Sequence, residues 1–245
     1  MDKIITGIQM EFKSLRIYKW QVITYLLILP LSYIFVMLLF GNIQRNDISY
    51  LLSGYIIASL IGSFAGLFAI RVCNLMQPEV LELYATFFIT IPQILISLSL
   101  TYIIISIPGI ALSSLLSIKY ANFANLLIFT GGIIISILAI LSLGLFLGLL
   151  IKNMFKAQGI IPLLSWGLLL FAPVYYKVQH LNLLYKVILL INPVTHTLNI
   201  LRISLGFPEI INIRWSFLYL SVLIIVIFIY SIKSFKRFYI LEKFY

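Results

Sequence analysis

The chain has 245 residues, of which 62% are hydrophobic and 10% are charged, and its formal net charge is +10. A soluble domain of this size carries roughly a quarter of its residues as charged side chains, so this composition excludes a soluble globular protein. An apolar helix of about 20 residues spans the bilayer core, and six such helices with short connections use the whole length. The sequence therefore predicts an all-α integral membrane protein, with one transmembrane domain over residues 1–245.

Residues 1–19 are too polar for a span and predict a helix that lies in the membrane interface. Ile4, Ile8, Phe12 and Leu15 follow one another at helical spacing on one face, while the rest is occupied largely by the charged residues Lys3, Glu11, Lys13, Arg16 and Lys19. A simple charged N-terminal anchor remains the alternative. The basic residues of the whole chain gather near the ends of apolar segments, so we expect membrane lipid, and no nucleic acid, as the partner of this charge.

The first span is predicted at 20–40 and the second at 50–70. In the second span Ala58, Gly62 and Gly66 recur at every fourth position. Small residues at this spacing let two helix backbones approach closely. The sequence leaves open whether this stripe faces a second copy of the chain or another helix of the same subunit.

Residues 71–91 form a polar interruption between the second and third spans, and 78–86 predict a short helix outside the bilayer core. Pro78 suits the first turn of a helix, where its missing N–H does no harm. Glu79 and Glu82 then lie near the positive end of the helix dipole.

The remaining spans are predicted at 93–116, 125–150, 158–176 and 213–232, with a kink at Pro108–Gly109 in the third. The segment 177–212 is too broken for a full span. It predicts an outer hairpin of two half-length helices, 183–191 and 195–205, split by Asn192–Pro193.

Eleven of the 17 basic residues fall on one side if the N-terminus is inside, and six fall on the other. This bias predicts a multi-pass protein of the cell membrane with both termini in the cytosol. It also places 71–91 in the cytosol and 177–212 outside.

The sequence lacks the residue clusters that membrane enzymes and ion-coupled carriers need. Its two histidines, His180 and His196, have no nearby carboxylate pair, and no phosphate-binding or nucleophile motif occurs, so we expect no catalytic, cofactor-binding or metal site. All seven acidic residues fall in predicted loops or interfaces, where they cannot couple transport to an ion inside the membrane. Any energy for uphill transport must then arrive from outside the chain, through 71–91.

Two stretches resemble the ABC-2 type transporter permeases, and the resemblance covers nearly the whole chain. The run from Asn192-Pro193-Val194-Thr195 to Leu201-Arg202 is similar to the family's N-P-[LV]-T-x-x-[LV] segment and following arginine. The run Glu79-Val80-Leu81-Glu82-Leu83-Tyr84 is similar to the family's G-T-L-E-x-L. Leu81 and Glu82 match there, while Glu79 and Val80 replace Gly-Thr.

The resemblance implies an exporter subunit without its own ATPase site. Two permease chains, identical or different, would pair above two ABC ATP-binding subunits, which would bind ATP and Mg. The 78–86 helix would couple to the ATPase together with part of the N-terminal helix, through Pro78, Glu79, Leu81, Glu82 and Tyr84. The outer hairpin motif comprises Asn192, Pro193, Thr195 and Arg202.

The apolar character of the path suits an amphipathic drug, peptide or lipid-like substrate. The polar residues of the first span that would line it are Thr24, Tyr25, Ser32 and Tyr33; they would equally serve hydrogen bonds between helices. A non-transporting membrane scaffold or immunity protein explains the hydrophobicity equally well, but neither the cytosolic helix nor the outer hairpin. A channel would require a charged or carbonyl ring, which the sequence lacks.

Overall fold

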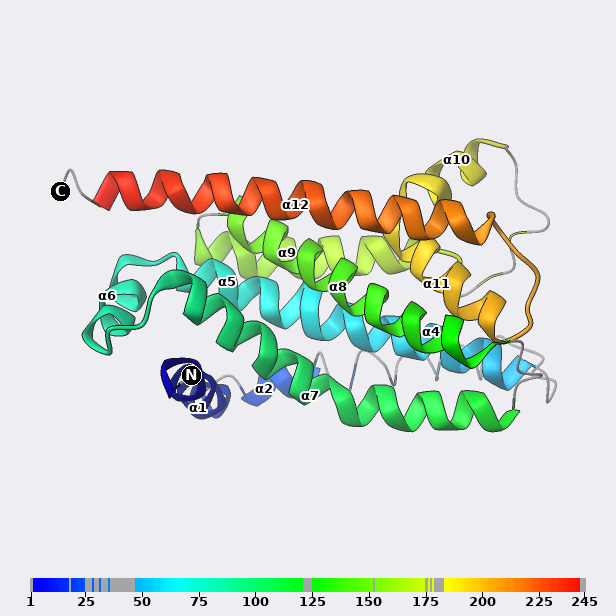
Figure 1. Ribbon diagram of the computed structural model, residues 1–245, viewed down its shortest axis with the longest axis horizontal. Coiled ribbons are helices and arrows are strands. Elements are labelled where there is room, and N and C mark those ends of the chain that lie inside the picture. Colours follow the sequence, from blue (N-terminus) through cyan, green and yellow to red (C-terminus); the bar gives the residue numbers. More distant parts are fainter. Residues whose placement is uncertain are drawn as a thin grey trace.

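The computed structural model describes residues 2–17, 19–24, 28, 31, 35, 47–120, 125–151, 153–174, 176, 178 and 183–242. These residues form an elongated helical bundle, and no strand occurs among them (Figure 1). The long helices run roughly along the long axis. The described helices begin with α1 (Asp2–Leu15) and α2 (Lys19–Ile23), and they include the short α6 (Pro78–Thr86) between two long ones.

Among the described residues, four helices are long and apolar enough to cross a bilayer. The first, Ile48–Leu75, is composed of α4 (Asp47–Leu60), the π-helical η2 (Ile61–Phe68) and α5 (Ala69–Leu75). The others are α7 (Ile91–Tyr120), α8 (Leu126–Leu150) and the part of α12 (Ile213–Glu242) up to Ser234. The short helices α10 (Leu183–Ile191) and α11 (Pro193–Ser204) meet at 88° and make a fifth crossing if they count as one bent span.

The number of six crossings stays a prediction. Most of the predicted span 20–40 lies outside the described residues. The predicted span 158–176 corresponds to α9 (Met154–Leu170), whose 17 residues are at the lower limit for a crossing. Its helix begins earlier than predicted because Asn153 caps it: the Asn153 side chain accepts a hydrogen bond from the N–H of Lys156.

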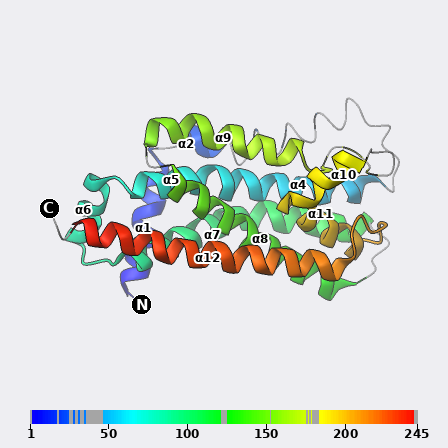
Figure 2. The same ribbon diagram turned by 90° about the horizontal axis from the view of Figure 1, so that it is seen from above.

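The helix Ile48–Leu75 lies at the centre of the bundle. In its most apolar window 94% of the residues are buried inside the chain, against 22% for α12, so α12 keeps most of its surface free for lipid. The central helix packs against α7 and α11 through α4, and against α8 and α9 through η2 and α5. Figure 2 shows these neighbours around it from above.

The structure also moves the start of the polar interruption and the end of the last helix. The polar interruption predicted from residue 71 begins later, because α5 continues to Leu75 and contains Arg71 and Asn74. Arg71 is tolerated there because an ion pair satisfies its charge. The last helix extends beyond the predicted 213–232 to Glu242, and its 30 residues span about 45 Å, which exceeds the bilayer core of about 30 Å.

Pro108 lies inside α7, as the predicted kink requires, and the helix changes direction part-way along its length (Figure 1). A proline in the interior of a helix removes one backbone hydrogen bond and clashes with the preceding turn. The bend is therefore attributed to Pro108.

The bundle has two distinct ends. At the first, here called the α6 end, α6 and the C-terminal end of α12 lie outermost, and α1 runs across the direction of the long helices (Figures 1 and 2). At the opposite end, the α11 end, α10, α11 and the beginnings of α4 and α12 come together. An orientation across the bundle suits a helix in the membrane plane, as predicted for residues 1–19.

Candidate functional site at the junction of α1, α5 and α6

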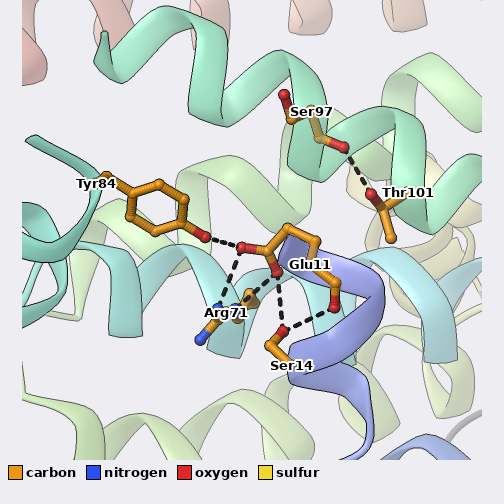
Figure 3. A network of polar contacts seen from close by, with 6 residues as sticks. All are labelled: Glu11, Ser14, Arg71, Tyr84, Ser97 and Thr101. Atoms are coloured by element: carbon orange, nitrogen blue, oxygen red, sulfur yellow. Dashed lines mark hydrogen bonds and ion pairs between the residues drawn. The ribbon is translucent and has the colours of Figure 1, made fainter. Parts of the chain in front are cut away.

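Glu11 is the centre of a polar cluster at the α6 end (Figure 3). Its side chain is 1% exposed and lies on the face of α1 that meets the bundle. The Nε of Arg71 in α5 donates to Oε2 of Glu11 at 2.9 Å, and Nη2 donates to Oε1 at 3.1 Å. This two-point contact fixes the guanidinium plane against the carboxylate, the strongest geometry available to such a pair.

Tyr84 of α6 joins the same carboxylate. Its hydroxyl donates to Oε1 of Glu11, so one carboxylate receives donors from both α5 and α6. Burial first, and the negative charge of Glu11 second, raise the pKa of Tyr84 well above its ordinary value. The phenol therefore remains protonated and available as a donor at any physiological pH. Through Glu11, α1 holds the end of one long helix and the short helix that follows it.

The contact between α1 and α7 is close enough to exclude any side chain at Gly7. A Cβ built there would lie 2.5 Å from the Ser97 hydroxyl oxygen. That hydroxyl donates to the carbonyl of Ile4 at 3.0 Å, which ties α1 to the first turns of α7. Gly7, Glu11 and Ser14 thus form the stripe of α1 that faces the bundle, while Phe12 is 42% exposed.

Among the residues predicted to couple to an ATPase, Tyr84 alone is buried. Pro78 begins α6, and it is exposed together with Glu79 and Glu82. Leu81 is half-buried. The helix therefore turns Tyr84 toward α1 and the two carboxylates toward the outside.

The predicted hairpin motif lies at the α11 end, where Asn192 separates α10 from α11. Its side chain accepts a hydrogen bond from the N–H of Val194 and donates to the carbonyl of Leu168 at 2.8 Å. Pro193 occupies the first turn of α11, where a proline is favourable. The Thr195 hydroxyl is buried and has no hydrogen-bond partner among the described residues.

Arg202 is a buried cation that joins α11 to the central helix. The side chain is 2% exposed and donates to the carbonyls of Pro173 at 2.7 Å and Val174 at 3.3 Å. Its Nε lies 3.4 Å from the Ser53 hydroxyl, and its Cζ lies 3.6 Å from the centre of the Tyr50 ring. Such a cation–π contact is strongest where water is excluded, so Arg202 is part of the interior and not of the outer surface.

Two further residues of this end were not predicted as parts of the motif. Asn199 accepts from the N–H of Ile210 at 2.9 Å and donates to the carbonyl of Ile211 at 2.6 Å, which closes the loop between α11 and α12. Nε2 of His196 lies 2.8 Å from the carbonyl of Leu190, so that nitrogen carries the hydrogen. His196 and Asn199 lie on α11 with Thr195, and the sequence pattern of this helix does not distinguish them from other buried residues.

The small-residue stripe is buried within the chain: Ala58, Gly62 and Gly66 all lie in the covered part of the central helix. The helix also meets α8 backbone to backbone. A Cβ at Gly144 would overlap the carbonyl oxygen of Phe64, and a Cβ at Gly148 would lie 2.6 Å from the carbonyl oxygen of Ala69. Packing inside one subunit therefore accounts for the burial of the stripe in this structure.

The residues predicted to line a path are only partly described. Thr24 is exposed, and its hydroxyl donates to the carbonyl of Trp20 at 2.9 Å within its own helix. Tyr25, Ser32 and Tyr33 lie outside the described residues, as does His180. Within the part of the chain that the structure describes, no three His, Cys, Asp or Glu side chains gather as metal ligands.

The sequence model of the ABC-2 type transporter family matches residues 7–205, which include the larger part of α1, the central helix, α6 and the hairpin motif. This chain belongs to the ABC-2 type transporter family. No curated protein matches it at a significant level. With its long apolar helices, this ABC-2 protein is a multi-pass membrane protein and the membrane component of a transporter.

Proposed function

We propose that this chain is the permease subunit of an ATP-driven exporter, powered by separate ATP-binding subunits that dock on α6. The observation that carries the proposal is the attachment of α6: its buried Tyr84 is bonded to Glu11 of α1, while Glu79 and Glu82 point outward. A short helix that is bonded to the bundle on one side and exposed on the other can transmit the movement of a subunit that binds its exposed side. Two ABC ATPase subunits would bind ATP and Mg, and two permease chains would form the path between them.

The proposed motion follows from the connections of α6. It is continuous with α7 through a short turn and follows α5 after Met76 and Gln77, so displacement of α6 displaces both neighbours. Glu11 adds α1 to the same unit through Arg71 and Tyr84. ATPase closure would thus move these helices together as a rigid body and change the side to which the path opens.

The proposed substrate is an amphipathic drug, peptide or lipid-like molecule. The support is the apolar character of the long helices, whose exposed side chains include large hydrophobic residues along α7, α8 and α12. Thr24, Tyr25, Ser32 and Tyr33 remain the proposed polar residues of the path.

Co-expression with ABC ATP-binding subunits from the same organism tests the docking role. We expect the two to co-purify, and we expect Glu82→Arg to weaken the complex, because a reversed charge would face the docking groove. Glu209→Arg is the matched control, since Glu209 is also exposed but lies beyond α11 at the opposite end. Unchanged co-purification after substitution of Glu79, Glu82 and Leu83 together would refute docking at α6 and favour a non-transporting scaffold.

A further inference from the structure

Phe88, just after α6, has a backbone conformation that is unusual for its residue type. Its φ is 51°, the left-handed value that glycine commonly takes at the end of a helix. The N–H of Ile89 bonds back to the carbonyl of Tyr84, which closes the turn around Phe88. Phenylalanine is strained in this conformation, whereas glycine or asparagine would be accepted readily.

The Phe88 ring is also unusually exposed. Its side chain is 80% exposed, and Leu83 and Phe87 beside it are 53% and 47% exposed. The ammonium of Lys3 in α1 donates to the backbone carbonyl of Phe88 at 2.7 Å, so α1 holds the turn in place. Neither the strain nor the exposure stabilises the isolated chain, and both are explained if another surface covers the ring.

Charge and position favour a protein as that surface over lipid. From Pro78 to Ile118 the sequence has no Lys or Arg, although the whole chain carries +10. The exposed Glu79 and Glu82 make the tip of α6 acidic, and the one cation that the described contacts place against the turn is Lys3, which is held by the carbonyl of Phe88. Negatively charged lipid attracts basic segments and not acidic ones. In both views α6 lies further from the middle of the bundle than α1 (Figures 1 and 2).

We propose that Phe88 is the apolar anchor by which this chain selects its ATP-binding subunit, which offers an apolar pocket rimmed by Lys or Arg side chains that meet Glu79 and Glu82. Lys3 is a positioning residue: it fixes the turn that presents the ring. This inference rests on the proposed function and adds the chemistry of the partner's surface to it.

Affinity for the ATP-binding subunit that co-purifies with this chain, measured on the purified full-length chain in nanodiscs, tests the anchor. Phe88→Asn keeps the left-handed turn and removes the ring, so we expect the Kd to rise at least roughly tenfold, as for buried aromatic anchors in other interfaces. Phe88→Gly provides a second variant with a relaxed backbone. Phe155→Ala is the matched control, because Phe155 is 87% exposed at the start of α9 and should leave the Kd unchanged.

The outcomes separate this inference from the proposed function. If Glu82→Arg weakens binding and both Phe88 variants bind as the unaltered chain does, the anchor is wrong and docking at α6 stands. If none of them changes the Kd, both proposals fail. Lys3→Met should weaken binding severalfold in the chain with Phe88, and it should cause no further loss in the Phe88→Asn variant. Lys3→Arg should bind as the unaltered chain does. An equal loss from Lys3→Met with and without the Phe88 ring would show that Lys3 does not position the ring.

A second experiment tests whether lipid covers the ring instead. Phe88→Cys is labelled with an environment-sensitive fluorophore, and the natural Cys73 should not react because it is buried. We expect a blue shift only when the ATPase is added. A blue shift on reconstitution into vesicles containing anionic lipid, with no further change on addition of the ATPase, would assign the ring to the membrane and overturn the proposal.

Discussion

Glu11 determines how α1 is attached to the rest of the protein. A carboxylate that is 1% exposed is strongly unfavourable unless donors surround it. Arg71 and Tyr84 supply those donors, and Ser14 adds a hydroxyl at 3.3 Å. Because the partners come from α1, α5 and α6, the hydrogen bonds to this buried carboxylate hold the three helices together (Figure 3).

Substitutions in the Glu11–Arg71 ion pair should not be additive. We expect Glu11→Gln or Arg71→Met alone to lower the free energy of unfolding by about 3 kcal/mol, because each leaves a desolvated partner unsatisfied. The double variant should lose less than the sum of the two, with a coupling of about 1–3 kcal/mol. Thermal unfolding in detergent measures the cycle, and additive losses would show that the two side chains do not interact.

Tyr84 should make the protein sensitive to alkaline pH. Its raised pKa means that the folded chain keeps the phenol proton more firmly than the unfolded chain does. Below the ordinary value of 10.0 both states are protonated and the contribution is complete; above it only the unfolded state releases the proton, so stability falls as the pH rises. Tyr84→Phe should reduce the steepness of this loss in unfolding curves recorded at successive pH values. An unchanged steepness would contradict the assignment.

At the level of elements, α8 crosses η2 and α5 in close backbone contact. Two glycines of α8, Gly144 and Gly148, allow its backbone to touch the carbonyls of the central helix. A stretch of π-helix at this crossing, Ile61–Phe68, is buried throughout. Such stretches are rare and often mark functional segments, and here it lies between the α11 end and the junction with α1.

The crossing makes a sharp prediction for substitutions in α8. Gly148→Ala should destabilise the protein by about 1–3 kcal/mol, because its methyl group would meet the Ala69 carbonyl and Val72, neither of which can move freely. Gly131→Ala on the same helix is the control, since nothing lies within 4 Å of a Cβ there. It should be neutral or slightly stabilising, as alanine favours helix formation. Equal melting temperatures for the two variants would contradict this contact.

Local signals and long-range pairings differ in how well the sequence reveals them. The helix predicted at 78–86 corresponds to Pro78–Thr86 because the proline that starts it is a local signal. The role of Glu11 was not predicted, since its partner Arg71 is 60 positions away and periodicity carries no pairing information. One signal was present: Glu11 follows Ile8 by three positions and Ile4 by seven, which places an acid on the otherwise apolar face.

At the scale of the whole molecule, the buried Arg202 sharpens the charge asymmetry between the two ends. The prediction of cytosolic termini counted Arg202 among the six basic residues outside. Its side chain lies in the interior against Tyr50 and the carbonyl of Pro173, so it does not act as an interfacial charge. Five residues then oppose eleven, and the bias that sets orientation becomes stronger.

Orientation can be tested with single cysteines at the two ends. Glu79→Cys places a thiol on exposed α6, and Glu209→Cys places one on the exposed loop after α11. The natural Cys73 should stay silent because it is buried and its thiol donates to the carbonyl of Ile151 at 2.7 Å. In intact cells a membrane-impermeant maleimide should label the variant at 209 and reach the variant at 79 only after permeabilisation. The reverse labelling pattern would show the opposite orientation in the membrane, with α6 outside the cell. An ATPase in the cytosol could then not dock on α6.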